Sequence, residues 1–225
     1  LKFNGEFAKS FNIIIQMGAI LSIPILFPRE VINLTKLKNM NGPCLIHLVI
    51  AIFPILSIGF LCGDFIKGSL FNVSVVLSTL IIGGVLLISV EIFFKDSKKN
   101  YNGITKMDAL IIGLFQCFAL IPGFSRSAAT IIGGRFKGLS SVDAAKFSFS
   151  IAIPILMIAS IYEAITCPWT DYPSYYVIFL AIGFLLSFVS SLIFVFLFIK
   201  IIRTLGLIPF GIYRIVIAVL IFFIR

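Results

Sequence analysis

The nine residues 122–130 carry the densest group of polar side chains within the apolar part of the chain. A Pro-Gly pair at their start ends the preceding helix, and either Ser125 or Ser127 is suited to cap the next one. A helix N-terminus offers free N–H groups and a positive dipole end, which bind anions. Arg126 adds a planar guanidinium that can hold two phosphate oxygens at once. The segment therefore predicts binding of a phosphate or diphosphate group.

Other polar residues lie within apolar runs and could contribute to the same site. Thr130 follows Ser127 at a spacing that places both hydroxyls on one helix face. Gln116 is suited to hydrogen bonding between helices or to site contact. Arg214 could contact a phosphate or pair with a carboxylate such as Glu91. We assign Gly123, Thr130, Gln116 and Arg214, together with Arg126 and the two serines, to this candidate phosphate site. The alternative for Arg126 is a purely structural role, in which its guanidinium pins the segment by binding carbonyl oxygens.

The composition of the chain indicates that these candidate site residues lie within a membrane. Of the 225 residues, 60% are hydrophobic and only 12% are charged, and the mean hydropathy is +1.16. A soluble domain carries about 25% charged residues, because its surface must be covered by polar groups. The composition excludes a soluble enzyme, a nucleic-acid-binding domain and a disordered tail. It predicts an all-α polytopic membrane protein with no nucleic-acid partner.

Cysteine and histidine provide no metal-binding pattern. The four cysteines are widely spaced and form no C-x-x-C pair, and His47 is the single histidine. A redox motif and a multi-histidine metal site are therefore excluded. We expect no metal ligands in this chain, and we expect His47 to be a satisfied structural residue.

Six apolar stretches are long enough to cross a bilayer, which takes about 20 residues. They are 11–27, 44–61, 73–94, 147–165, 175–199 and 207–224. The stretch 107–134 differs, because a Pro-Gly break divides it into two arms that are each too short to span. It predicts a re-entrant helical hairpin whose irregular backbone lines a protein cavity.

The basic residues test this topology. The net charge is +9, and most Lys and Arg residues fall in loops 28–43, 95–106, 135–146 and 200–206. Basic loops stay in the cytoplasm. If all four face the cytoplasm, 107–134 must leave and return on the same side. Loop 166–174, which has no basic residue, is then expected to face outside.

An internal repeat is also indicated. Similar short entries, Glu6-Phe7-Ala8-Lys9 and Asp143-Ala144-Ala145-Lys146, each lead into three spans of opposite orientation. This pattern is typical of an inverted-topology repeat with its site at the repeat interface. We expect a single integral-membrane domain over 1–225, with a first repeat unit 1–106 and a second unit 107–225 that begins with the hairpin. A matching hairpin before the first unit is missing, so the chain is expected to be truncated at its start.

The residues resemble a known family. The segment 122–130 is similar to the second signature motif of the bacterial undecaprenyl-diphosphate phosphatases of the bacitracin-resistance type. The flanking sequences agree as well: Phe115-Gln116-Cys117, Phe147-Ser148-Phe149, Ile208-Pro209-Phe210, Tyr213-Arg214 and the first long span from Phe11 to Leu21. The resemblance covers essentially the whole chain.

The resemblance implies a function. Members of that family remove the terminal phosphate from a C55 polyprenyl diphosphate, which recycles the lipid carrier of cell-wall synthesis. It implies that Arg126, Ser125, Ser127 and Thr130 bind the diphosphate, and that Ser125 or Ser127 assists the attack. On this resemblance we assign Arg126, Ser125 and Ser127 to catalysis, and Gly123, Thr130, Gln116 and Arg214 to substrate binding. It also implies a divalent cation, Mg²⁺ or Ca²⁺, a lipid substrate among membrane lipids, and a multi-pass location in the bacterial cytoplasmic membrane. The resemblance leaves open whether the protein forms a homodimer.

One part of the family pattern is absent. The glutamate-rich first motif, of the type E-x-x-x-E-F-L-P-x-S-S-x-G-H, should precede Phe11 and does not. The family's metal carboxylates and catalytic histidine are thought to belong to that motif, so the chain is expected to be inactive alone. Two other interpretations remain: a transporter or lipid flippase for an anionic substrate, and a degenerate gene product without activity.

Overall fold

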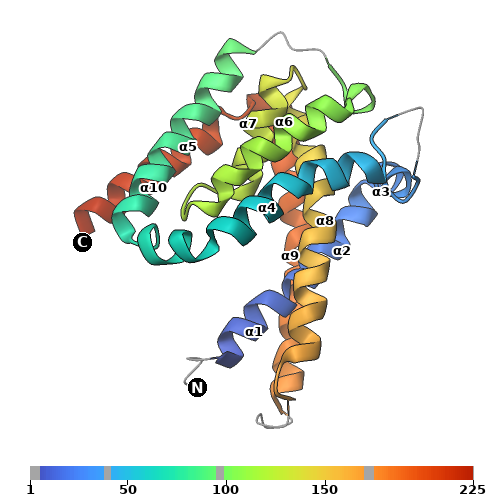
Figure 1. The fold of residues 1–225 in the computed structure, drawn as a ribbon, viewed down its shortest axis with the longest axis vertical. Helices are drawn as coiled ribbons and strands as arrows, with labels where there is room; N and C mark the ends of the chain where they lie inside the picture. The colour runs from blue at the N-terminus through green and yellow to red at the C-terminus, as the bar shows by residue number, and fades with distance from the viewer. Residues whose placement is uncertain (1–5, 38–41, 95–98, 170–174, 225) are drawn as a thin grey trace. The chain divides into compact units, whose positions relative to one another are not determined.

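The computed structural model describes residues 6–37, 42–94, 99–169 and 175–224, and every regular element among them is helical (Figure 1). Ten α-helices and two short 3₁₀ helices follow one another in these ranges. In chain order they are α1 (Glu6–Ile14), α2 (Gln16–Leu26), α3 (Pro28–Leu34), α4 (Leu45–Ser69), α5 (Val73–Phe93), η1 (Tyr101–Gly103), α6 (Lys106–Gln116), η2 (Cys117–Leu120), α7 (Arg126–Phe136), α8 (Ser141–Thr166), α9 (Tyr175–Leu205) and α10 (Ile208–Ile224).

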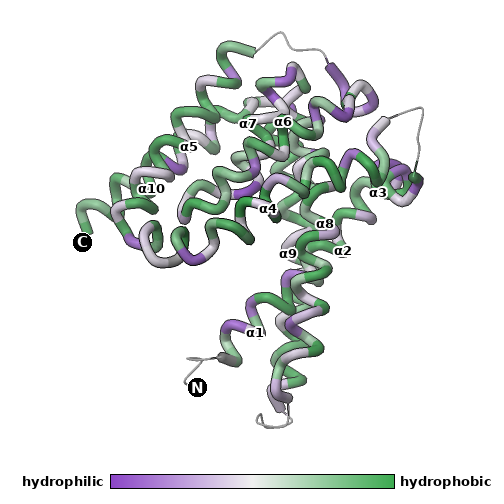
Figure 2. The backbone as a smooth tube through the Cα atoms, viewed as in Figure 1, coloured by the Kyte–Doolittle hydropathy of each residue, from purple (hydrophilic) through white to green (hydrophobic). Residues whose placement is uncertain are grey.

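The long apolar helices coincide with the predicted spans. Five are long and apolar enough to cross a membrane: Phe7–Leu26, Leu45–Ile66, Val73–Phe93, Ser141–Thr166 and Tyr175–Leu205. The sixth, α10, is apolar but has 17 residues, which is the lower end of what a bilayer requires. In Figure 2 most of the residues along α5 and α10 have the colour of hydrophobic residues. The prediction of an all-α polytopic membrane protein is confirmed.

The helices extend beyond the predicted spans at several places: α4 continues to Ser69, α8 begins at Ser141, and α3 and α9 occupy parts of two predicted loops. Helix α3 lies in the predicted loop 28–43, where Pro28 fits the first helical position and Glu30 lies in the first turn. Helix α9 continues to Leu205, so most of the predicted loop 200–206 is helical and its turn comes at Gly206, with φ of 69°. Periodicity could not show these ends, because their basic residues suit either a loop or an exposed last turn.

The chain divides into two compact units, which are described separately. The first consists of Leu1–Val31 and Ser150–Phe198. Its helices are joined by hydroxyl groups at membrane depth: Ser10 donates to the Glu163 carboxylate at 2.5 Å, and Ser22 and Ser191 lie 2.8 Å apart. Gly18 packs directly on the Phe184 carbonyl, so the α2 and α9 backbones touch.

The second unit, Ile32–Phe149 and Ile199–Arg225, contains the predicted hairpin. Helices α6 and α7, of 11 residues each, are joined by η2 and a short loop and pack on each other. They are antiparallel, because Phe118 stacks on Phe124 near the loop, whereas the Asp108 carboxylate reaches Lys137 at the opposite end. The hairpin packs on α4 and α5, and α10 packs on α5.

Small residues allow these helices to approach closely. A Cβ at Gly133 would lie 2.8 Å from the Phe115 Cβ on α6, and one at Gly134 would lie 2.8 Å from the Ala144 Cβ on α8. Gly113 packs on the backbone of Ala51 in α4. The small residues of the second arm thus let α6 and α8 approach α7 closely.

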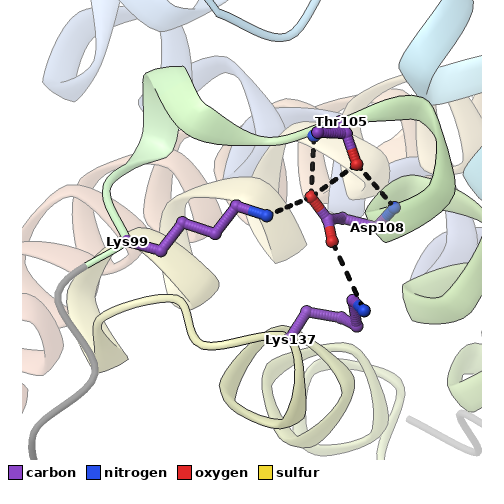
Figure 3. A network of polar contacts seen from close by, with 4 residues as sticks. All are labelled: Lys99, Thr105, Asp108 and Lys137. Carbon is purple, nitrogen blue, oxygen red and sulfur yellow. Dashed lines mark hydrogen bonds and ion pairs between the residues drawn. The ribbon is translucent and has the colours of Figure 1, made fainter.

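A polar network closes the base of the hairpin (Figure 3). The Asp108 carboxylate accepts hydrogen bonds from the Thr105 N–H at 2.8 Å and the Thr105 hydroxyl at 2.7 Å, and it binds the ammonium of Lys99. Its other oxygen lies 3.8 Å from the Lys137 ammonium. Thr105 precedes the first arm and Lys137 follows the second, so the hairpin begins and ends at the same place.

The basic loops meet around this base. The Lys99 N–H donates to the Gly138 carbonyl at 3.1 Å, which joins loops 95–106 and 135–146. The Glu91 carboxylate accepts from Ser141 at 2.7 Å and lies against Gly206. A Cβ at Gly42 would lie 2.7 Å from the Asn102 side-chain oxygen. The four loops that the charge pattern assigns to one side of the membrane are thus joined at one end of the hairpin, three by direct contacts and loop 200–206 through Glu91.

Candidate phosphate-binding site

Ser125 caps helix α7 and holds an unusual backbone conformation. Its hydroxyl accepts from the Ala128 N–H at 3.4 Å and lies 3.2 Å from the Ser127 hydroxyl. Its φ of 73° is the one positive value at a residue other than glycine among the described residues. Such a conformation costs about 1–3 kcal/mol and persists where the surroundings enforce it. The capping role predicted for Ser125 or Ser127 belongs to Ser125.

Arg126 follows directly as the first residue of α7. Its side chain is half-buried, Ser125 is exposed and Ser127 is half-buried, so all three reach the surface at the hairpin tip. Within the described ranges no hydrogen bond or ion pair is made by the Arg126 guanidinium. The described residues therefore do not support the alternative in which the Arg126 guanidinium pins the hairpin by binding carbonyl oxygens.

The loop before Ser125 is pressed against helix α5. Gly123 has φ of 87°, and a Cβ there would lie 2.5 Å from the Thr79 hydroxyl oxygen and 2.7 Å from the Val76 carbonyl oxygen. Only glycine fits this close approach. The Thr79 hydroxyl lies 2.6 Å from the Pro122 carbonyl oxygen, to which it can donate.

Arg214 reaches the same loop from helix α10. Its Nη2 donates to the Gly123 carbonyl at 3.0 Å and to the Thr79 carbonyl at 3.2 Å. Gly83 leaves the space for this guanidinium, because a Cβ there would lie 2.5 Å from Nη2. Glu91 instead binds Ser141 and lies 3.5 Å from the Arg135 Nε. Arg214 thus holds the loop backbone, and its assignment to substrate binding stays a prediction.

Thr130 and Gln116 lie deeper than the loop. Thr130 is 1% exposed, and its hydroxyl contacts the Ser148 hydroxyl at 2.6 Å. Gln116 is fully buried, with its amide nitrogen 3.5 Å from the Ala51 carbonyl oxygen and no hydrogen bond at its own amide oxygen among the described residues. The hairpin tip thus brings together Gly123, Ser125, Arg126 and Ser127, with Arg214 behind them. Thr130 and Gln116 face neighbouring helices instead.

The chain is similar to known proteins over nearly its whole length. A family model described as bacitracin resistance protein BacA matches residues 1–220. The chain belongs to this family. It is 37% identical to undecaprenyl-diphosphatase 1 of Bacillus anthracis, over 98% of this chain and 84% of that protein. The resemblance predicted from the segment 122–130 is confirmed, and this BacA-family chain is a multi-pass protein of the bacterial cytoplasmic membrane.

Thr79 is the residue of this BacA-family site that sequence reasoning missed. A threonine in the middle of an apolar span is usually taken to bond its own helix, since its hydroxyl can bind the carbonyl four residues earlier. The Thr79 hydroxyl does lie 2.9 Å from the Val75 carbonyl oxygen, but the Pro122 oxygen is closer. Its separation of 43 residues from Pro122 hides this contact in the sequence.

Other residues with metal-binding potential serve the fold. The His47 Nδ1 accepts from the Cys44 N–H at 3.2 Å and closes a capping box at the start of α4, so the structural role expected for His47 is confirmed. No group of three or more His, Cys, Asp or Glu side chains that could hold a metal ion lies in the described part of the chain. These residues therefore do not supply a ligand set for the divalent cation that the resemblance implies.

Proposed function

We propose that this chain is a membrane-embedded phosphatase that converts undecaprenyl diphosphate to undecaprenyl phosphate and inorganic phosphate. Water supplies the oxygen that bonds to the terminal phosphorus, and the bond from that phosphorus to the bridging oxygen breaks. The bridging oxygen stays with the lipid phosphate. The relative named undecaprenyl-diphosphatase and the BacA family support this reaction. Neither favours the alternative of a transporter or flippase.

The observation that carries the proposal is that the guanidinium of Arg126, a residue flanked by two serines, has no hydrogen bond or ion pair with any described residue. A guanidinium at membrane depth is costly unless an anion compensates it. Arg126 has no partner among the described residues, whereas Arg135 has Glu91 and Arg214 has two carbonyls. A diphosphate is the partner that its planar fork fits.

Each residue at the tip has a distinct part in this proposal. Arg126 holds the phosphate oxygens in the ground state and stabilises the charge that moves to the leaving oxygen. The hydroxyls of Ser125 and Ser127 lie within hydrogen-bond distance of each other. One of them orients the attacking group or donates to a phosphate oxygen. Gly123 lets the loop lie close to α5, which fixes where α7 begins.

Replacement of Arg126 tests the proposal in a protein that carries the family's glutamate-rich first motif before residue 1. Arg126→Ala should lower kcat/KM for phosphate release from a polyprenyl diphosphate by about 100- to 1,000-fold, because it removes charge stabilisation in a dry site. Arg126→Lys should rescue poorly, since an ammonium cannot reproduce the bidentate fork. Arg203→Ala is the matched control, because this exposed arginine at the end of α9 should be dispensable.

One result for Arg126→Ala would contradict the proposal. A folded Arg126→Ala protein that keeps more than roughly a third of the wild-type activity would remove Arg126 from the site. Lipid translocation without phosphate release would favour the transporter.

The divalent cation is proposed on the resemblance alone and has its own test. Phosphate release should stop when a chelator removes divalent cations and return when Mg²⁺ or Ca²⁺ is added. No step above uses the cation, because the described residues do not hold a ligand set for it.

A further inference from the structure

We infer that Thr79 is a positioning residue for the hairpin tip, and that it acts through the Pro122–Gly123 backbone to hold Ser125 and Arg126 in place. The inference rests on the proposed function for its activity readout. Its geometric content, a clamp between α5, α10 and the loop, can be tested without any activity.

The hydroxyl of Thr79 provides the first half of the clamp. It carries one proton and has three carbonyl oxygens in reach: Val75 at 2.9 Å, Val76 at 3.0 Å and Pro122 at 2.6 Å. The first two belong to its own helix and accept hydrogen bonds from that helix. The Pro122 oxygen lies in a loop where no helix supplies a donor. The Thr79 hydroxyl therefore stabilises the structure most by donating its proton to the Pro122 carbonyl oxygen.

The backbone carbonyl of Thr79 provides the second half. It accepts from the Arg214 Nη2 at 3.2 Å, and the same nitrogen donates to the Gly123 carbonyl at 3.0 Å. Two consecutive loop carbonyls are thus fixed by one residue of α5 and one residue of α10. Buried backbone carbonyls need partners, and here the partners also determine the path of the loop.

The clamp explains how the strained residue is held. Ser125 lies two residues after Gly123, and its φ of 73° needs surroundings that enforce it. Thr79 is 7% exposed, and its hydroxyl oxygen would lie 2.5 Å from a Cβ on Gly123, on the side of the loop that faces α5. The Gly123 backbone therefore separates Thr79 from the outer surface of the loop. Thr79 acts through the loop and not by contact with the phosphate.

Two replacements of similar size separate the hydroxyl from the volume. Thr79→Val keeps the shape and removes the proton donor, whereas Thr79→Ser keeps the donor. Thr204→Val is the matched control, because that exposed hydroxyl contacts only its own helix, at the Lys200 and Ile201 carbonyls. The activity measured is phosphate release from a polyprenyl diphosphate, in detergent, by a protein that carries the family's glutamate-rich first motif before residue 1.

Thr79→Val should lower kcat by about 10- to 100-fold with KM changed by less than about 3-fold, because misplaced groups lose transition-state contacts more than ground-state binding. Thr79→Ser should keep kcat within about 3-fold of wild type, and Thr204→Val should match wild type. A Thr79→Val protein that keeps kcat within about 3-fold of wild type would overturn the inference, because it would show that the hydrogen bond to the loop does not matter.

Hydrogen exchange measured by mass spectrometry gives the readout that needs no activity. The amides of Phe124 and Ala128 are bonded within the tip, to the Ile121 carbonyl and the Ser125 hydroxyl. In Thr79→Val, peptides that cover 121–129 should exchange at least about 10-fold faster, while peptides from α9 stay unchanged. Unchanged exchange at the tip would overturn the clamp. If wild type released no phosphate, the proposed function would fail while this measurement still decided the role of Thr79.

Discussion

At the residue scale, Ser125 combines a capping hydroxyl with a backbone conformation that a serine seldom adopts. Both properties act at the start of α7. There Arg126 lies between Ser125 and Ser127 in the sequence, and the hydroxyls of these two serines are 3.2 Å apart. A glycine would adopt this φ without strain, but it would remove one of the hydroxyls that the proposed reaction uses. Activity and stability are thus expected to oppose each other at this position.

Ser125→Gly should raise the free energy of unfolding by about 1 kcal/mol, since relief of strain outweighs the few tenths lost by a glycine cap. Phosphate release should fall at the same time. Ser125→Ala should lower the free energy of unfolding by about 1 kcal/mol, because it keeps the strain and loses the cap. Melting in detergent checks both variants, and a lower melting temperature for Ser125→Gly would show that no strain is stored there.

At the element scale, the hairpin depends on direct backbone contact between α6 and α4. Gly113→Ala should lower the free energy of unfolding by about 1–3 kcal/mol, because its Cβ would meet the carbonyl and Cα of Ala51. Gly63→Ala on α4 is the control, since nothing lies within 4 Å of its added Cβ. That control should be neutral or up to about 1 kcal/mol more stable, as alanine favours a helix over glycine.

The base of the hairpin should make stability depend on acid pH. Burial alone would raise the pKa of the Asp108 carboxyl, but hydrogen bonds from Lys99 and Thr105 together outweigh burial and hold that pKa below its ordinary value. The ionised form is thus favoured in the folded state. Its contribution is complete above about pH 4, the pKa of an unfolded aspartate, and is lost as pH falls through the lower folded value.

Asp108→Asn should therefore flatten the acid arm of the melting profile and lower the melting temperature at neutral pH. Asp143→Asn is a comparison, because this half-buried carboxylate accepts from the Ser140 hydroxyl but has no lysine bonded to it among the described residues. An unchanged acid arm in Asp108→Asn would show that other carboxyls control the profile.

At the scale of the whole molecule, the contact between the four basic loops predicts the orientation of the chain. A single cysteine should be placed at Thr166 or at Thr204 in a protein whose native cysteines are replaced, because Cys167 itself is 6% exposed. Both positions are exposed helix ends. An impermeant thiol reagent added outside should label position 166 in intact cells and position 204 only after permeabilisation. The reverse pattern would invert the topology.

The spans, the hairpin and the cap of α7 could be predicted from the sequence because each depends on neighbouring residues. Span length, the break at Pro122 and the spacing of serines are all local. The clamp could not be predicted, since Arg214 lies 91 residues from Gly123 and 135 from Thr79. A lone arginine in an apolar helix suits a phosphate and a carbonyl equally well until its surroundings are known.

Arg214 also has a consequence for the order of biosynthesis. The hairpin tip is translated well before α10, but one of the two groups that hold its carbonyls lies on α10, 91 residues after Gly123. Chains fold as they emerge, from the N-terminus onward. The nascent chain therefore carries a loosely held tip until its C-terminal helix has entered the bilayer and docked on α5. Anion binding at the tip is therefore expected to develop late in maturation. A chain that ends before residue 214 contains Arg126 but lacks the Arg214 contact that fixes the loop before it.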